Sequence, residues 1–181
     1  VEGAVKLTKT YVVGNPLDQS TTMGPLAQAR FADFIREQKA EATRKGATAH
    51  VNMKVDLDKP GSPYMAPEIY TGVDHQMSLM REESFGPVVG IMKVRGDEDA
   101  IALMNDSPYG LTASIWTQDI EHAAAIGDRV ETGTVFMNRC DYLDPALVWT
   151  GVKDTGKGAS LSVLGIQGLT RPKSYHLKII S

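Results

Sequence analysis

The sequence predicts an α/β protein with an open, mainly parallel sheet and flanking helices. Apolar, β-rich stretches at residues 88–94, 111–116 and 134–137 alternate with helical patterns at 97–104 and 119–130. Strands that are joined through helices pair in parallel by right-handed crossovers. We therefore expect a parallel sheet whose ligands bind near the carboxyl ends of its strands.

The residues before this alternation predict two further helices. Apolar residues at helical spacing in 1–7 indicate that the chain begins inside a helix, and hence that it is a piece of a longer protein. A second helix is predicted over 25–45, with Gly46 as its C-terminal cap. Its mainly apolar stripe consists of Phe31, Phe34, Ile35, Gln38 and Ala42.

Turn residues and alternation predict the remaining segments. The Pro/Gly-rich stretch 58–63 is typical of an exposed loop, and 68–73 of a short strand. Residues 138–168 form a glycine-punctuated loop region that is long enough to suggest a functional segment. Residues 174–180 alternate as in a strand, with Tyr175, Leu177 and Ile179 on one face. Such a strand needs a pairing edge, which a partner subunit could supply.

Composition excludes several classes of function. The chain has 181 residues, with 19 Lys and Arg against 22 Asp and Glu, so it has no strong basic character and we expect no nucleic-acid or membrane partner. Its longest apolar runs are far shorter than the ~20 residues of a membrane helix. The single cysteine excludes an internal disulfide and fits a reducing compartment, for which the cytoplasm is the default.

Three patterns that could carry chemistry have simpler interpretations. Arg139 would favour a thiolate at Cys140, but no histidine lies near in sequence to act as its base. The stretch 151–158 nearly matches a phosphate-binding loop, although Gly158 replaces the required hydroxyl residue. The four histidines lack metal-ligand spacing, so we expect no metal site.

An acidic pair, Glu82 and Glu83, precedes an aromatic residue and a Gly-Pro turn at the start of a predicted strand. A carboxylate beside an aromatic ring suits a polyol such as ribose, because the carboxylate accepts hydrogen bonds while the ring supplies an apolar contact. A solvated charge pair is the alternative interpretation.

The stretch 81–87 (REESFGP) resembles a signature of the aldehyde dehydrogenase superfamily. Residues 12–18 (VVGNPLD), 23–26 (MGPL), 105–113 (NDSPYGLTA) and 133–138 (GTVFMN) resemble successive blocks of that family in the same order. The sequence is therefore identified as a member of this superfamily, similar to the later part of its chain.

The resemblance implies oxidation of an aldehyde to a carboxylic acid, with NAD or NADP as hydride acceptor. The family's nucleophilic cysteine, general-base glutamate and dinucleotide-binding domain belong to the earlier part. We therefore expect no catalytic residue in this chain, and no activity from it alone. Glu83 matches the family glutamate that binds the nicotinamide ribose, and Phe85 matches the aromatic residue by the nicotinamide. Gly86 and Pro87 are expected to be structural residues near that site.

The resemblance also implies residues on the substrate side. Asn138 matches a family asparagine after the third strand and is expected to be structural. Asp141, Leu143 and Trp149 occupy positions that line the family's aldehyde tunnel. Leu143 and Trp149 favour a hydrophobic or aromatic aldehyde, whereas Arg139 could equally attract a carboxylate. The aldehyde itself and the choice between NAD and NADP stay open.

The family fold implies two parts: residues 1–168 as the C-terminal part of the catalytic domain, and 169–181 as an oligomerisation strand. A dimer or tetramer of identical subunits is then expected. Two alternatives remain. The chain could be a non-catalytic oligomerisation module with a vestigial site, or a self-sufficient thiol enzyme that uses Cys140.

Overall fold

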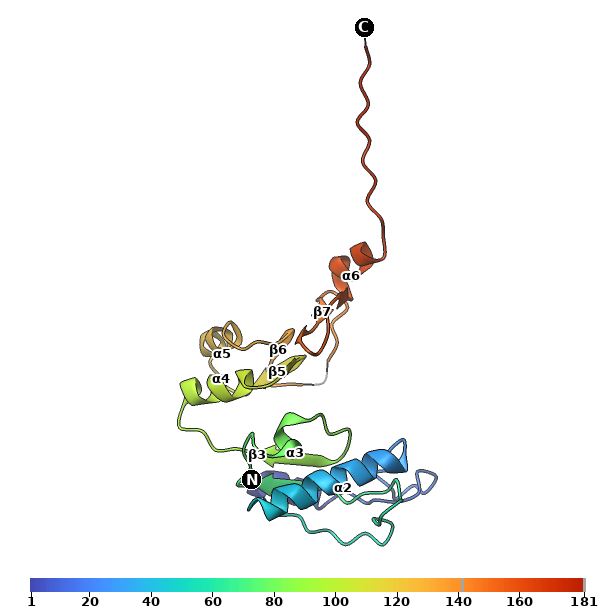
Figure 1. Cartoon of the computed structure of the whole chain (residues 1–181), viewed down its shortest axis with the longest axis vertical. Helices are drawn as coiled ribbons and strands as arrows, with labels where there is room; N and C mark the ends of the chain where they lie inside the picture. The colour runs from blue at the N-terminus through green and yellow to red at the C-terminus, as the bar shows by residue number, and fades with distance from the viewer. Residues whose placement is uncertain (141, 181) are drawn as a thin grey trace. The chain divides into compact units, whose positions relative to one another are not determined.

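The computed structural model describes residues 1–140 and 142–180, and it confirms the α/β class predicted from the sequence. The chain forms two compact units, Val1–Lys93 and Val94–Ser181 (Figure 1). Each unit is described below by itself.

The first unit consists of a three-stranded mixed sheet and three helices. β2 lies between β1 and β3, antiparallel to β1 and parallel to β3. The elements are α1 (Glu2–Thr8), α2 (Ala29–Arg44), β1 (Thr48–Ala49), β2 (Glu68–Thr71), α3 (Ser78–Arg81) and β3 (Val88–Ile91).

α2 is the longest helix of the described chain (Figure 1). Its buried residues are Ala32, Ile35, Gln38 and Ala42. Phe31 and Phe34, which the predicted stripe included, are instead 37% and 43% exposed. Each lies one residue before a buried position, and one residue turns a helix by about 100°, which moves these rings off the buried face. The C-cap residue is Lys45, and the predicted Gly46 follows it with φ +98°, the left-handed conformation typical of the position after the cap.

The core of the first unit lies between α2, α3 and the sheet. Around Ala42, one cluster combines residues of α2, β2 and the segment leading into α3. Around Ile35, a second cluster joins α2 to Met65, with Leu26 and Val88 packed against it. The first cluster comprises Ala42, Ala47, Tyr70, Val73, Met77 and Leu79.

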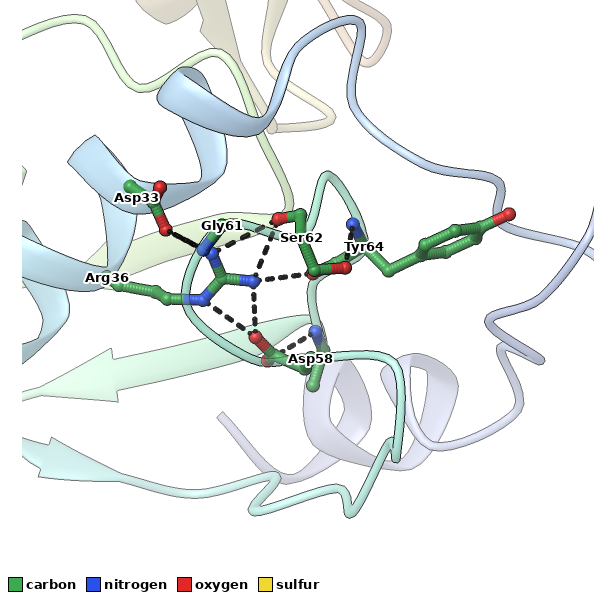
Figure 2. Close-up of polar contacts among 7 residues, drawn as sticks. Asp33, Arg36, Asp58, Gly61, Ser62 and Tyr64 are labelled. Carbon is green, nitrogen blue, oxygen red and sulfur yellow. Dashed lines mark hydrogen bonds and ion pairs between the residues drawn. The ribbon is translucent and has the colours of Figure 1, made fainter.

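A guanidinium ties the loop before β2 to α2 (Figure 2). The Arg36 Nε and Nη2 atoms donate to Asp58 Oδ1 at 2.9 and 2.8 Å. Asp58 in turn accepts from the Ala66 amide at 2.9 Å. The predicted loop at 58–63 is thus present, but Asp58 and Arg36 are both only 18% exposed. The other acceptors of Arg36 are Asp33 Oδ1 and the carbonyl oxygens of Ser62 and Tyr64.

In the second unit, β5 and β6 form a parallel pair, in register from Thr112↔Thr134 to Ile115↔Met137. Ile101, Ala113 and Val130 form its small core. The elements are α4 (Asp97–Asn105), β4 (Tyr109–Gly110), β5 (Thr112–Ile115), α5 (Ile120–Gly127), β6 (Thr134–Met137), β7 (Trp149–Thr150), β8 (Val152–Lys153), β9 (Ala159–Ser160) and α6 (Ser162–Gly168).

Strand pairing differs in detail from the prediction. The alternation over 88–137 predicted three strands in one sheet, whereas β3 pairs with β2 in the first unit and β5 pairs with β6 in the second. The chain between β2 and β3 contains α3, and this short crossover lets the two strands pair in parallel. Residues 138–168 are not only a loop, since they contain β7, β8, β9 and α6.

Residues 174–180 form no strand with the described residues of this chain. Leu177 and Ile179 are 85% and 96% exposed, and the segment continues beyond α6 as an extended trace (Figure 1). An alternating segment forms a ladder only where an edge is offered to it, and no described residue of this chain pairs with it. Its role between subunits stays a prediction.

Candidate functional site

Glu83 and Phe85 lie on the segment that connects α3 to β3 in the first unit. Both side chains are exposed, Phe85 to 71%. Ser84, between them, is half-buried. The segment therefore presents a carboxylate and an aromatic ring to solvent and directs the intervening hydroxyl inward.

Gln38 of α2 contacts this segment on its buried side. Its Oε1 accepts a hydrogen bond from Ser84 Oγ at 2.7 Å. Its Nε2 makes a longer contact, 3.5 Å, to the Ser78 carbonyl at the start of α3. Gln38 is 2% exposed, so the amide end of this contact is buried, whereas Ser84 is half-buried.

Glu41, one turn further along α2, holds the start of α3. Its carboxylate accepts from the Ser78 amide at 2.8 Å and from the Ser78 hydroxyl. Lys45 Nζ donates to the other oxygen at 2.6 Å and also to the Gln76 carbonyl. The Lys45 and Ser78 hydrogen bonds lower the pKa of Glu41 from 4.5 to about 2.

Gly86 brings the backbone of the segment against α2. A Cβ atom built on it would lie 2.3 Å from Ile35 Cδ1 and 3.2 Å from Leu26 Cδ2. Pro87 follows, and its carbonyl accepts from the Glu68 amide at 2.9 Å where β2 begins. Both residues thus fix where the segment meets the sheet.

A hollow of about 330 Å³ lies beside this point. Its lining is mostly apolar and comes from the end of α1 and the segment after it, from β2 and its preceding residue, and from β3 and the residues before it. It is bounded by Thr8, Tyr11, Met23, Pro67, Glu68, Ile69 and Gly86 to Val89.

Glu68 is a buried carboxylate that the sequence analysis missed. It is 6% exposed and accepts from the backbone amides of His50, Val51 and Asn52 at 3.1, 2.7 and 3.0 Å. A charged residue at the start of a short, mainly apolar strand was the signal in the sequence that could have indicated this burial. These bonds join residues 50–52 to β2, which is a structural role.

In the second unit, Leu143 and Trp149 line one pocket of about 220 Å³. The Arg139 guanidinium lies 4.3 Å from the centre of the Tyr142 ring at this pocket. The structure therefore brings two of the three predicted tunnel residues together, while Asp141 lies outside the described residues. The remaining lining is Thr134, Phe136, Asp144, Leu147, Val148 and Leu161.

Asn138 joins the ends of β5 and β6 beside this pocket. Its Oδ1 accepts from the Thr117 amide at 3.0 Å and its Nδ2 donates to the Thr117 carbonyl at 2.7 Å. Its backbone has φ +55°, a region that asparagine tolerates better than most residues. These contacts hold the chain where it leaves β6 toward Arg139.

The other chemical candidates of the sequence show no assembled site among the described residues. Cys140 is exposed. Lys153, in the stretch resembling a phosphate loop, donates to the Asn105 and Ser107 carbonyls at 2.7 and 3.1 Å and pairs with Glu131 at 2.7 Å. Among residues 1–140 and 142–180 there is no group of three or more potential metal ligands. No helix in the same residues is both long and apolar enough to cross a bilayer.

Comparison with known proteins relates this α/β chain to a single protein family. The model of the aldehyde dehydrogenase family matches residues 1–175. An aldehyde dehydrogenase from Paenarthrobacter nicotinovorans is 39% identical over 163 residues, which are 90% of this chain and 35% of that protein. A geranial dehydrogenase from Castellaniella defragrans is 34% identical, over 98% of this chain and 36% of its own length.

Solved structures agree with the sequence comparison. Succinic semialdehyde dehydrogenase from Streptococcus pyogenes, solved in complex with NADP+, has a TM-score of 0.82 and 36% identity, covering 91% of this chain and 36% of that one. The chain belongs to the aldehyde dehydrogenase family. It spans about a third of the length of the curated relatives it matches.

Proposed function

We propose that this chain is the C-terminal part of the catalytic domain of an NAD(P)-dependent aldehyde dehydrogenase. The observation that supports this most is the exposed pair Glu83 and Phe85 on a segment braced by α2. Glu83 accepts hydrogen bonds from the hydroxyls of the nicotinamide ribose, and Phe85 packs beside the nicotinamide. The bound cofactor supplies the hydride acceptor.

The residues present suit such a ligand. A carboxylate has two oxygens that accept hydrogen bonds from adjacent hydroxyls of a ribose, and an exposed ring adds apolar contact without competing for them. Ser84 and Gly86 hold the backbone on both sides of Phe85, so binding has to order the two side chains but not the segment that carries them.

The substrate side of the proposal concerns the pocket of the second unit. Its lining of Leu143, Trp149, Phe136 and Tyr142 favours an aldehyde with a hydrophobic or aromatic tail. An aldehyde that carries a carboxylate would instead bind to the Arg139 guanidinium, which lies over the Tyr142 ring. The names of the relatives support both alternatives, since geranial dehydrogenase agrees with the apolar one and succinic semialdehyde dehydrogenase with the acidic one.

The test uses the full-length enzyme that contains this chain and the substitution Glu83→Gln. This change keeps the shape but removes the charge that strengthens the ribose hydrogen bonds, so kcat/KM for NAD(P)+ should fall about ten- to hundredfold. Initial rates of NAD(P)H formation measure it. An aromatic and an acidic aldehyde, assayed side by side, distinguish the two substrate alternatives.

Glu82→Gln is the matched control, because Glu82 is an exposed neighbour with the same charge. It should leave the cofactor kinetics close to those of the parent enzyme. Equal kinetics for the Glu83 and Glu82 variants would remove the proposed role of Glu83. Turnover by the 181-residue chain alone that Cys140→Ala abolishes would instead establish a self-sufficient thiol enzyme.

A further inference from the structure

We propose that Gln38 of α2 is a positioning residue that sets the affinity for NAD(P)+ through Ser84. This inference rests on the proposed function of Glu83 and goes beyond it, because Gln38 lies 46 residues before Ser84 in the sequence and faces the buried side of the segment.

The burial of Gln38 needs an explanation. A side-chain amide that is 2% exposed loses its hydration, and only internal hydrogen bonds offset that cost. Its neighbours on the same helix face, Ile35 and Ala42, are apolar, and an apolar residue of similar size would fill the space as well. The amide thus contributes something that packing alone does not require.

The amide holds the backbone in place between the two side chains that would face the ligand. Ser84 lies directly between Glu83 and Phe85, and its hydroxyl is bound to Gln38 Oε1 at 2.7 Å. Ser84 is half-buried and faces α2, whereas Glu83 and Phe85 on either side of it are exposed. Holding the Ser84 hydroxyl at α2 therefore fixes the point of the backbone from which both exposed side chains extend.

The neighbouring contacts do not replace this one. Gly86 packs on Ile35 after the ligand-facing pair, and Ser78 binds Glu41 before it. Five residues separate Ser78 from Ser84, and the second Gln38 contact, to the Ser78 carbonyl, is long at 3.5 Å. The Ser84 hydroxyl makes a short side-chain hydrogen bond at the middle of the segment, where Glu83 and Phe85 lie.

The test compares Gln38→Leu, Ser84→Ala and their double variant in the full-length enzyme. Each single change removes the same hydrogen bond, so each should raise the KM for NAD(P)+ about three- to tenfold. The KM for the aldehyde should stay within about twofold of the parent value. The double variant should be no worse than the stronger single variant, because all three variants lose the bond between Gln38 and Ser84.

Two controls keep the result specific. Glu37→Gln changes an exposed neighbour on α2 and should leave both KM values unchanged. Ser84→Thr keeps the hydroxyl and should retain most of the cofactor affinity. If Gln38→Leu fails to fold, Ser84→Ala decides the question alone, because its small change lies outside the helix.

Other outcomes would overturn the proposal. Equal rises in the KM for cofactor and aldehyde would indicate general loosening instead of positioning. An unchanged cofactor KM for Ser84→Ala, in an enzyme where Glu83→Gln does raise it, would reject the role of Gln38 while keeping the proposed function. Unchanged kinetics for Glu83→Gln itself would reject the proposed function.

Discussion

Gly86 shows how one residue can decide where the cofactor-facing segment lies. A methyl group at this position would collide with Ile35 Cδ1, and Ile35 is 1% exposed and has little room to move. We predict that Gly86→Ala lowers the free energy of unfolding by about 1–3 kcal/mol, as overpacking does elsewhere. Urea denaturation of the chain measures it.

A second substitution tests the cause. Ile35→Val deletes the Cδ1 atom with which the new methyl group collides. The double variant Gly86→Ala/Ile35→Val should therefore lose less free energy of unfolding than the sum of the losses of the two single variants. Gly3→Ala is the control, since a Cβ on Gly3 meets no atom within 4 Å. Additive losses in the double variant would show that the collision is not the reason.

Residues differ in how far the sequence predicts them. Glu83 and Phe85 were predicted from a local motif of seven residues, and their exposure agrees with a ligand-facing role. Gln38 was placed on the helix stripe, but its partner Ser84 lies 46 residues away. Pattern and spacing act locally, so a bond between distant side chains becomes visible only when the chain is folded.

At the scale of elements, we expect the stability of the contact between α2 and α3 to depend on pH. Glu41 has its pKa lowered from 4.5 to about 2, first by the Lys45 hydrogen bond and then by those of Ser78. A carboxyl with a lowered pKa contributes stability that is fully present above pH 4.5 and is lost as the pH falls toward 2.

We therefore predict that Glu41→Gln lowers the melting temperature most above pH 4.5. The difference from the parent chain should shrink as the pH falls toward 2, where the parent carboxyl also becomes neutral. Thermal melts of the chain at a series of pH values measure it. Glu37→Gln should show no such pH-dependent difference, and a gap that stays constant down to the lowest pH would contradict the assignment.

Elements with several turns or strong alternation were predicted well. α4, α5 and β6 lie close to their expected ranges, because helical spacing and apolar runs identify them. β7, β8 and β9 were missed, since two residues are too few to show alternation. The pairing of β3 with β2 was also missed, because the sequence does not record which edge a strand joins.

At the scale of the whole molecule, the apolar side chains of segment 174–180 are exposed, and the segment pairs with no described strand of this chain. We predict that it mediates self-association of the full-length enzyme as an added strand. Replacing Leu177 and Ile179 together by Asp should lower the oligomer mass, because both exposed side chains would be buried on pairing. Light scattering after size-exclusion chromatography measures it.

Lys178 supplies the control, since alternation puts it on the opposite face from Leu177 and Ile179. Lys178→Gln should keep the oligomer intact. An unchanged mass for the Leu177/Ile179 variant would assign self-association to another surface. A variant that loses its oligomer but keeps normal turnover would separate assembly from catalysis.

The single thiol of the chain has a practical consequence. Cys140 is exposed, and its neighbours Arg139 and Tyr142 line the pocket of the second unit. Since the 181 residues contain one cysteine, a maleimide fluorophore would label this chain at one known place. Its emission would respond to the polarity beside Arg139 and Tyr142, and so would indicate when a molecule binds next to these two pocket residues.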